Sequence, residues 1–264
     1  MQELMMKTSR REEIIRLLKE NRVVKANELS VKFDVSMETI RRDLEGLEVE
    51  GVARRVHGGA VFNSFSSKEP DFSFRKISHF DEKVQIGRCA AELVGDNETV
   101  IIDLGTTTLE MARFLLQRKD LTVITNSLRI AMLLMDSPGV RVILCGGVVR
   151  NGEGTTSGFW AEDMVDRFVV DKLFLGVGAF DLHDGVTDYH VEETNLRRHF
   201  IKQAKKVFAL ADYSKFGSSA LNRICSVKEL DCLITDSGTD RNVISDLRSM
   251  GLEVIVAQPQ EDPV

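Results

Sequence analysis

Seven short apolar runs, separated by amphipathic segments, occupy the chain from Asp81 onward and limit the fold more than any other feature. The runs are TVIID (99–103), LTVIT (121–125), VRVILC (140–145), KLFLGVGAF (172–180), KVFALA (206–211), CLITD (232–236) and EVIVA (253–257). Continuous β-branched strands that alternate with helices are typical of a parallel sheet covered on both faces. The sequence therefore predicts an α/β domain with a mostly parallel sheet. Ligands bind such sheets beyond the carboxyl ends of the strands.

The composition predicts a reduced, cytoplasmic protein. With 264 residues, 43% of them hydrophobic, the chain can form one large domain or two unequal ones. No apolar run reaches the roughly 18 residues of a membrane span, and the N-terminus lacks the apolar core of a secretory signal. The four cysteines are Cys89, Cys145, Cys225 and Cys232. Because they form no CxxC pair, we expect neither a disulfide framework nor a metal site. We expect no cofactor either.

Charge and composition divide the chain into three parts. Residues 1–62 carry a net charge of +1 and the remainder carries -7. The stretch 63–80 is rich in serine, contains Pro70 and shows no sustained period, so we interpret it as a linker. The predicted domains are therefore 1–62 and 81–264.

The first 62 residues show the pattern of a winged helix-turn-helix. The predicted elements are a first helix capped by Ser9 and Glu12, a second helix from about Ala26 to Phe33, a turn at Asp34-Val35, a third helix from Ser36 to Gly51, and a hairpin made of VARRV, His57-Gly58-Gly59 and AVF. In this layout the third helix enters the DNA major groove and the hairpin contacts the backbone or minor groove.

The third helix, SMETIRRDLEGLEVEG (36–51), has a face suited to base contacts. With Ile40 at the core, the helical period turns Glu38 and Arg42 outward. An outward arginine can bind guanine and an outward glutamate can accept from cytosine. The alternative is that Glu38–Arg42 and Arg41–Glu45 are ordinary ion pairs on a solvated helix. The predicted DNA contacts are Ser36, Met37, Glu38, Thr39, Arg41, Arg42, Arg54, Arg55 and His57, the last three on the hairpin.

A phosphate can be held where the first strand of the α/β domain ends. The stretch Asp103-Leu104-Gly105-Thr106-Thr107-Thr108 leads from TVIID into a helix. Backbone N–H groups, three hydroxyls and the positive end of the helix dipole converge there. It is not a Walker A loop, because no GK[ST] follows. The alternative is a capped turn without a ligand.

Three further loops follow predicted strands. They are Thr125-Asn126-Ser127, Gly146-Gly147 and 212–217, which contains Lys215. Together with the phosphate loop they suit a polyol phosphate, although Asn126 and Lys215 alone are more often turn and surface residues. In DYHVEET (188–194), His190, Glu192 and Glu193 are either a specificity loop or favourable acids at a helix N-terminus.

These motifs resemble those of a known family. The run VSMETIRRDLEGLEVEGVARRVHGGA is similar to the N-terminal motif of the DeoR family of bacterial transcriptional regulators. The stretches DLGTTT, TNS, GG, DYSKFG and ITD resemble the sensor domain of that family, and the similarity runs from about residue 8 to 257. Phe159 and Trp160 stand where smaller residues are usual.

The resemblance implies both fold and function. It implies a winged helix-turn-helix with Ser36, Thr39, Arg41 and Arg42 on the recognition helix. It also implies a sensor domain similar in fold to ribose-5-phosphate isomerase and glucosamine-6-phosphate deaminase. Family members commonly repress catabolic operons until a phosphorylated sugar accumulates. The implied effector contacts are Asp103, Gly105, Thr106, Thr107, Thr108, Asn126, Gly146, Gly147 and Lys215.

The expected function is thus a regulator, not an enzyme, that binds double-stranded operator DNA and is released by a phosphorylated sugar. A winged domain contacts one half-site, so a homodimer or homotetramer is expected. One alternative is a sugar-phosphate isomerase or deaminase, for which Glu193, Asp212 or Lys215 would be the candidate base. Binding to RNA or an anionic protein is the other, and the lack of an aromatic platform in residues 1–62 disfavours RNA.

Overall fold

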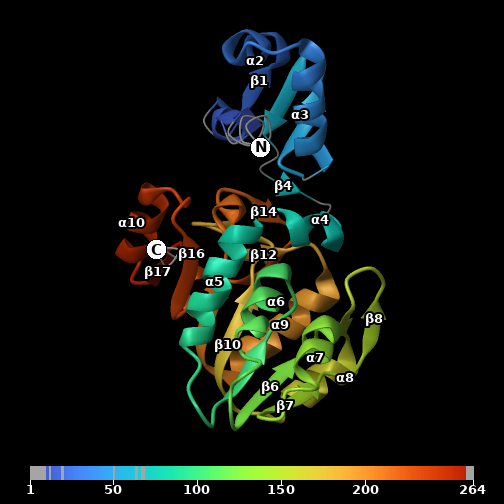
Figure 1. The fold of residues 1–264 in the computed structure, drawn as a ribbon, viewed down its shortest axis with the longest axis vertical. Coiled ribbons are helices and arrows are strands. Elements are labelled where there is room, and N and C mark those ends of the chain that lie inside the picture. The colour runs from blue at the N-terminus through green and yellow to red at the C-terminus, as the bar shows by residue number, and fades with distance from the viewer. Residues whose placement is uncertain are drawn as a thin grey trace. The chain divides into compact units, whose positions relative to one another are not determined.

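The computed structural model describes residues 10–11, 13–18, 21–49, 51–62, 65–66 and 69–259 (Figure 1). The chain forms two compact units, Met1–Pro70 and Asp71–Val264. Helix α4, Phe72–Ile77, lies within residues 63–80, the predicted linker.

The first unit is a winged helix-turn-helix, as predicted. Arg10, Arg11 and residues 13–18 are helical, whereas the predicted cap residues Ser9 and Glu12 lie outside the described residues. The elements that follow are β1 (Val23–Lys25), α2 (Ala26–Phe33), α3 (Met37–Val49), β2 (Ala53–Val56), β3 (Gly59–Phe62) and β4 (Phe65–Ser66).

Local signals account for the helix ends in this unit. Asp34 has φ 49°, and its N–H donates to the Ser30 and Val31 carbonyls in the last turn of α2, which stops that helix. At the start of α3, the Thr39 N–H donates to Ser36 Oγ at 3.1 Å, so Ser36 caps the helix as predicted. Strand β1 was not predicted. It pairs antiparallel with β3, and its three residues are too few to show a strand period.

The second unit is built on a seven-stranded sheet. Its strand order is β17-β16-β13-β10-β5-β6-β7, and every neighbouring pair is parallel. The strands are β5 (Thr99–Ile102), β6 (Leu121–Thr125), β7 (Val140–Leu144), β10 (Val170–Gly176), β13 (Ala204–Leu210), β16 (Cys232–Asp236) and β17 (Glu253–Ala257). The predicted α/β class and parallel sheet are confirmed.

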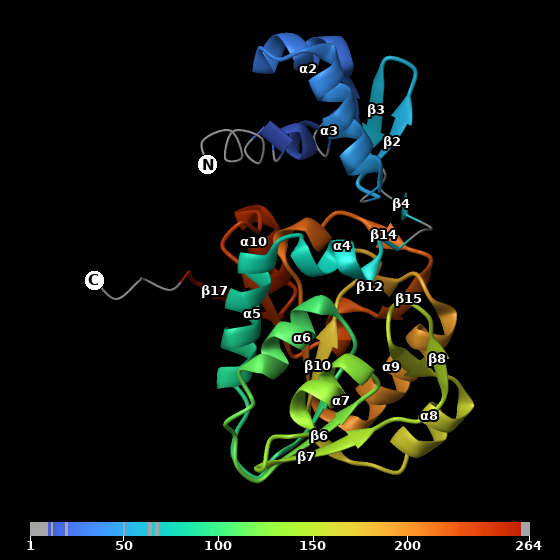
Figure 2. The same cartoon turned by 45° about the vertical axis from the view of Figure 1, so that its right-hand side comes forward.

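Helices cover both faces of this sheet. The helices are α5 (Phe80–Glu92), α6 (Thr106–Arg113), α7 (Leu128–Leu134), α8 (Phe159–Val165), α9 (Val191–Gln203) and α10 (Arg241–Ser249). Figures 1 and 2 show α5, α6 and α7 on one side of the strands. Their core includes Val100 and Ile102, whereas Ile101 joins the core beneath α8, α9 and α10. Alternate residues of one strand therefore serve opposite layers.

The second unit also contains two small antiparallel sheets. One consists of β11 (Ala179–Asp181), β12 (Gly185–Asp188) and β15 (Asn222–Cys225), and the other is the hairpin of β8 (Val148–Arg150) and β9 (Thr155–Ser157). The remaining short elements are strand β14 (Ser219–Ala220) and 3-10 turns at Tyr213–Lys215 and Val227–Glu229. The run 172–180, predicted as one strand, is split between β10 and β11. A Cβ on Gly178 would lie 2.7 Å from Asp188 Oδ2, so this crossing requires glycine.

The described residues show neither a membrane-spanning helix nor a cluster of metal ligands. No helix in this part of the chain is long and apolar enough to cross a membrane. Nor does the described chain place three or more His, Cys, Asp or Glu side chains to hold a metal ion. All four cysteines are free thiols, and burial raises the pKa of Cys145, Cys225 and Cys232 to about 12.

Candidate functional site

The exposed face of α3 carries the side chains predicted to contact bases. The Arg42 side chain is 77% exposed, and its Nε lies 3.5 Å from Glu38 Oε1. Ile40, Leu44 and Leu47 bury the opposite face of the helix, so Glu38 and Arg42 point outward as predicted. The Glu38–Arg42 ion pair of the alternative interpretation therefore exists, but an exposed pair at this spacing contributes only about 0.3–0.5 kcal/mol. It leaves both groups available to a partner.

Two predicted contacts, Ser36 and Thr39, have a structural task as well. Ser36 Oγ accepts from the Thr39 N–H and lies 2.9 Å from Thr39 Oγ1. Both residues therefore hold the N-terminus of α3, where a helix in a major groove presents its side chains to bases. Met37, the first residue of α3, is 37% exposed.

The hairpin supplies three predicted contacts, and one of them is held against α3. Arg55 Nη1 lies 2.6 Å from Glu45 Oε1, and the Arg55 N–H donates to Glu48 Oε1. Glu45 thus pairs with Arg55 of the hairpin. The alternative interpretation predicted an Arg41–Glu45 pair, which is not among the ion pairs of the described residues. Arg54 and His57 are exposed.

A groove of about 510 Å³ is lined by residues of both the hairpin and α3. Four of the nine predicted DNA contacts line it. The lining residues are Ala26, Met37, Arg41, Leu44, Arg55, Val56, His57, Gly58 and Gly59. Cationic side chains on two sides of one groove suit a phosphate backbone.

In the second unit, a buried charge cluster lies at the carboxyl end of β5. Asp103 is fully buried; its Oδ2 accepts from Arg197 Nε at 2.8 Å and from the Gly176 N–H at 3.1 Å. Arg197 Nη1 lies 2.5 Å from Asp188 Oδ2 in a second ion pair that lacks hydrogen-bond alignment. Two carboxylates thus share one buried guanidinium.

Burial and charge act in opposite directions in this cluster. Burial raises the pKa of Asp103 to about 6, although Arg197 opposes the change. Burial also acts to raise the pKa of Asp188, but the Arg197 charge and the N–H groups of Tyr189 and His190 outweigh it, so the pKa is lowered. Asp103 Oδ1 is buried and has no hydrogen-bond partner within the described chain. An unsatisfied buried oxygen of this kind can accept from a ligand hydroxyl.

The predicted phosphate loop forms the N-terminus of α6. Gly105 has φ 141°, a conformation that favours glycine, and precedes the first helical residue. Thr108 Oγ1 donates to Gly105 O at 3.1 Å, so Thr108 closes the turn. Thr106, Thr107 and Thr108 are all buried. The loop is therefore a rigid βα turn with its N–H groups at the helix end.

Asn126 joins this loop to its neighbours. It is fully buried, its Oδ1 accepts from the Leu104 N–H at 3.1 Å, and its backbone carbonyl accepts from the Thr156 N–H. Asn126 thus holds the β5 and β6 ends together. Gly147 has φ 127° and lies against Ser157 O, whereas a Cβ on Gly146 would meet nothing within 4 Å.

Lys215 ends the 3-10 turn after β13, a strand that β10 separates from β5 in the sheet. With His79 and Lys83, Lys215 lowers the pKa of the buried Asp212 against the opposing effect of burial. No hydrogen bond or ion pair within the described chain joins Lys215 to the Asp103 cluster. Asp212 Oδ2 is buried without a partner among the described residues.

Sequence reasoning did not single out Arg197 or Lys83. Arg197 stands beside Leu196 and Phe200, which occupy the buried side of α9, and this helical spacing was the available signal. Lys83 is buried, and its Nζ donates to Arg75 O and Ser78 O at the end of α4. Burial lowers its pKa to about 8.

Residues 188–194, predicted as either a specificity loop or favourable acids at a helix N-terminus, lead into α9. Val191 begins α9, with Glu192 and Glu193 in its first turn. Glu193 is buried: it accepts from Thr155 Oγ1 at 2.5 Å and pairs with Arg150 Nη1 at 2.9 Å. Glu192 stays exposed.

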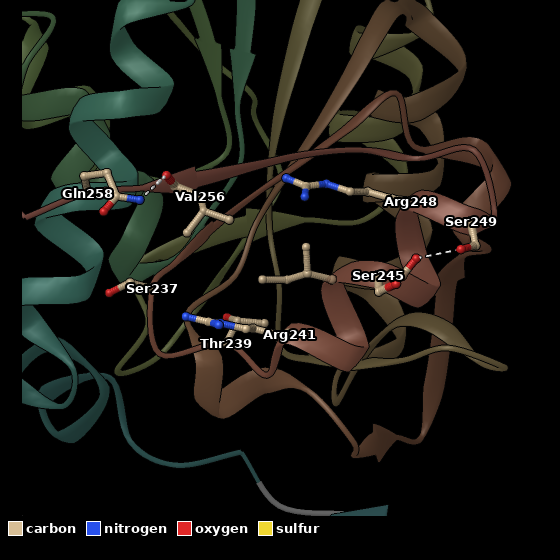
Figure 3. Close-up of a pocket in the computed structure, with 9 residues that line it drawn as sticks. Ser237, Thr239, Arg241, Ser245, Arg248, Ser249, Val256 and Gln258 are labelled. Carbon is tan, nitrogen blue, oxygen red and sulfur yellow. Dashed lines mark hydrogen bonds between the residues drawn. The ribbon is translucent and has the colours of Figure 1, made fainter.

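A separate hollow of about 810 Å³ lies between α10 and β17 (Figure 3). Arg248 reaches from α10 to β17, where its Nη2 donates to Val254 O at 2.8 Å. None of the predicted effector contacts lines this hollow. Strands β16, β13 and β10 separate β17 from β5 in the sheet, so the hollow is distinct from the Asp103 cluster.

Comparison with known proteins relates the chain to regulators over nearly its whole length. It is 36% identical over 249 residues to the HTH-type transcriptional regulator GolR of Listeria innocua, covering 94% of this chain and 98% of that protein. It is 35% identical to a putative aga operon transcriptional repressor of Escherichia coli O157:H7, with 94% and 93% coverage. The glycerol-3-phosphate regulon repressor of Escherichia coli K12 is 34% identical, with 88% and 92% coverage.

Among solved structures, ribose 5-phosphate isomerase A from Methanocaldococcus jannaschii matches with a TM-score of 0.40 and 19% identity, covering 53% of this chain and 55% of the isomerase. That likeness is too distant to bear on activity. Two family models match directly: the DeoR-like helix-turn-helix domain at residues 10–65 and the DeoR C terminal sensor domain at residues 78–237. The chain therefore belongs to the DeoR family of transcriptional regulators.

Proposed function

We propose that this protein represses a sugar or polyol catabolic operon and is released from operator DNA by a phosphorylated sugar. The observation that carries the proposal is that one chain contains both an outward Glu38–Arg42 face on α3 and a rigid loop at the end of strand β5. That loop combines the N–H groups of α6 with the unpartnered Asp103 Oδ1. Names of related repressors agree with a sugar or polyol operon.

The effector site would use the loop in two ways. The N-terminus of α6 would hold the phosphate, since unpaired N–H groups and the helix dipole favour an anion there. Asp103 Oδ1 would accept from a sugar hydroxyl. Asn126, Gly146, Gly147 and Lys215 complete the proposed contacts.

Release from DNA requires the effector to prefer a form of the protein that binds DNA less well. Because one winged domain contacts a half-site, we propose a homodimer or homotetramer that spans two half-sites about 34–36 Å apart. Sedimentation of the purified protein tests this. Operator DNA also implies a cytoplasmic location.

Thermal-shift screening tests the effector. The panel is glycerol 3-phosphate, glucose 6-phosphate, fructose 1-phosphate and glucosamine 6-phosphate, each beside its unphosphorylated parent compound. A ligand that binds only the native state stabilises it, by about 2.7 kcal/mol at a hundred times Kd. We expect one phosphorylated compound to raise Tm by several degrees and its parent compound to raise it little. A panel without any such effect would contradict the proposal.

Lys215→Ala tests the place of Lys215 in the site. We expect the variant to bind operator DNA as the parent does and to lose release by the panel compound. Lys205→Ala is the control, because Lys205 pairs with Asp171 near the amino ends of the strands. Release of Lys215→Ala at the parent's effector concentration would remove Lys215 from the site.

An isomerase or deaminase is the second candidate, and one observation favours it. Asp212, one of the candidate bases, has a buried Oδ2 without a hydrogen-bond partner among the described residues, and such a carboxylate oxygen can accept a proton in acid–base chemistry. Turnover of any panel sugar phosphate by the purified full chain would support the enzyme, and its absence would support the regulator.

A further inference from the structure

The Asp103 cluster continues into a chain of buried polar contacts. From Asp103 the first link is Arg197, through the 2.8 Å contact of Nε with Oδ2. Arg197 belongs to α9, and Glu193 stands one turn earlier on the same helix with only 1% of its surface exposed. Glu193 and Arg197, four residues apart, therefore lie on the same side of α9.

Glu193 connects α9 to the hairpin of β8 and β9. Its two carboxylate oxygens contact opposite strands of that hairpin: Oε1 accepts from Thr155 Oγ1 at 2.5 Å, and Oε2 pairs with Arg150 Nη1 at 2.9 Å. Arg150 and Thr155 are themselves partners across the hairpin. Glu193 thus fixes the base of the turn 151–154.

The turn then contacts α4. Glu153, which is buried in the turn, forms an ion pair with Arg75 of α4. Arg129 reinforces the same contact: its Nε donates to Glu153 O at 3.0 Å, and its guanidinium lies 3.9 Å from the Phe72 ring centroid. In both views the turn after β8 approaches α4 (Figure 1, Figure 2).

Helix α4 is the first element of its unit. It begins at Phe72, and the preceding unit ends at Pro70. Helix α4 is therefore the element of its unit that the chain joins directly to the winged helix-turn-helix unit. Lys83 also donates to the carbonyls of Arg75 in α4 and of Ser78 directly after it, so α4 is held at its last turn as well.

We propose that the series Asp103, Arg197, Glu193, Glu153 and Arg75 is a relay that transmits effector binding at Asp103 to helix α4. The proposal rests on the proposed function of the Asp103 loop as an effector site. Buried ion pairs suit such a relay because a stretched pair leaves uncompensated buried charge. The contacts therefore exchange between discrete arrangements, which packed interiors favour over continuous deformation.

Glu153→Gln tests the relay, because it removes the charge that binds Arg75 without touching a proposed effector contact. DNA affinity is measured on a duplex selected by the parent protein from a random library. The ligand is the panel compound that raises the parent's Tm most. Ligand affinity is read from the fluorescence of Trp160, the one tryptophan of the chain, which lies three residues after β9.

In the parent, saturating ligand should weaken DNA binding by about ten-fold or more. In Glu153→Gln, the ligand effect on DNA binding should fall to about two-fold or less, while DNA affinity without ligand and ligand affinity stay within about two-fold of the parent. A variant released as strongly as the parent would overturn the relay alone. A parent that no panel compound releases would overturn the proposed function and the relay with it.

Two further variants guard against a general loss of structure. Glu98→Gln is the control, because Glu98 forms a partly buried pair with Lys172 Nζ at 2.6 Å, and neither residue belongs to the relay. It should respond to ligand as the parent does. The charge exchange Arg75→Glu with Glu153→Arg should recover most of the response that either single change removes. Failure of the exchange, with both proteins folded by thermal melting, would count against the relay.

Discussion

At the scale of the residue, arginines of this chain do two different tasks. Arg42 is 77% exposed and pairs loosely with Glu38, whereas Arg197 is 2% exposed and lies between two buried carboxylates. Solvent screens the first pair and hardly affects the second. We therefore expect substitution of Arg42 to change recognition of a partner, and substitution of Arg197 to leave buried charge without compensation.

Arg42→Ala should weaken operator binding by about 1–3 kcal/mol and relax the choice of base at one position of each half-site. Fluorescence anisotropy on a set of single-base operator variants measures both effects. Arg167→Ala is the control, because Arg167 is 72% exposed and forms the same kind of i,i+4 pair, with Asp163 of α8. Equal affinities for parent and Arg42→Ala on every duplex would return Arg42 to the role of a surface ion pair.

Lys83 should make stability depend on pH in the alkaline range. Its folded pKa of about 8 lies below the ordinary 10.5, because burial disfavours the charged form. Between these values the unfolded chain binds more protons than the folded one, so rising pH stabilises the parent, by at most about 3 kcal/mol. Urea unfolding of the parent and Lys83→Met at pH 7.5 and 10 measures the difference. The same pH dependence in both proteins would rule out this role.

At the scale of the element, the β7–β8 connection shows why two adjacent glycines differ. Gly147 has φ 127°, and a Cβ there would lie 2.3 Å from Ser157 O across the hairpin. Gly146 has open space at the same position. Gly147 is required by the close approach of β9, whereas Gly146 is free to contact a ligand.

Gly147→Ala should lower the free energy of unfolding by about 1–3 kcal/mol, because both the backbone conformation and the contact with Ser157 oppose a side chain. Gly146→Ala, its neighbour and control, should change stability by about 0.5 kcal/mol or less. Urea unfolding of both variants tests the difference. Equal losses would mean that the hairpin does not depend on the Gly147 conformation.

At the scale of the whole molecule, each unit has its own apolar core, so we expect each unit to be stabilised by its own ligand. One apolar cluster, which includes Ile14, Leu18 and Ile40, lies within the first unit, and two clusters flank the sheet of the second. A ligand stabilises the unit to which it binds. Operator DNA and effector should therefore protect different parts of the chain.

Calorimetry of the full chain measures this. We expect the active panel compound to raise the midpoint of the larger transition, which belongs to the sheet unit, by a few degrees, and selected operator DNA to raise the other. Identical shifts of both transitions with either ligand would show that the two units unfold as one.

Much of the fold could be predicted because its signals are local. The seven strand runs, the limits of α2 and the Ser36 cap each depend on residues within a few positions of one another. Helical period alone placed Glu38 and Arg42 on the outside of α3. Strand β1 escaped prediction because three residues carry no period, and β11 because only the crossing at Gly178 separates it from β10.

The charge network was decided by tertiary structure. Asp103 and Arg197 are 94 positions apart, Arg75 and Glu153 are 78 apart, and Arg150 and Glu193 are 43 apart. Nothing local pairs them, because their proximity follows from the strand order that sets β10 beside β5 and places α9 over it. The sequence by itself thus determined which elements form and which loops carry polar groups. The sheet determined which buried charges meet, since only packing brings distant residues out of water together.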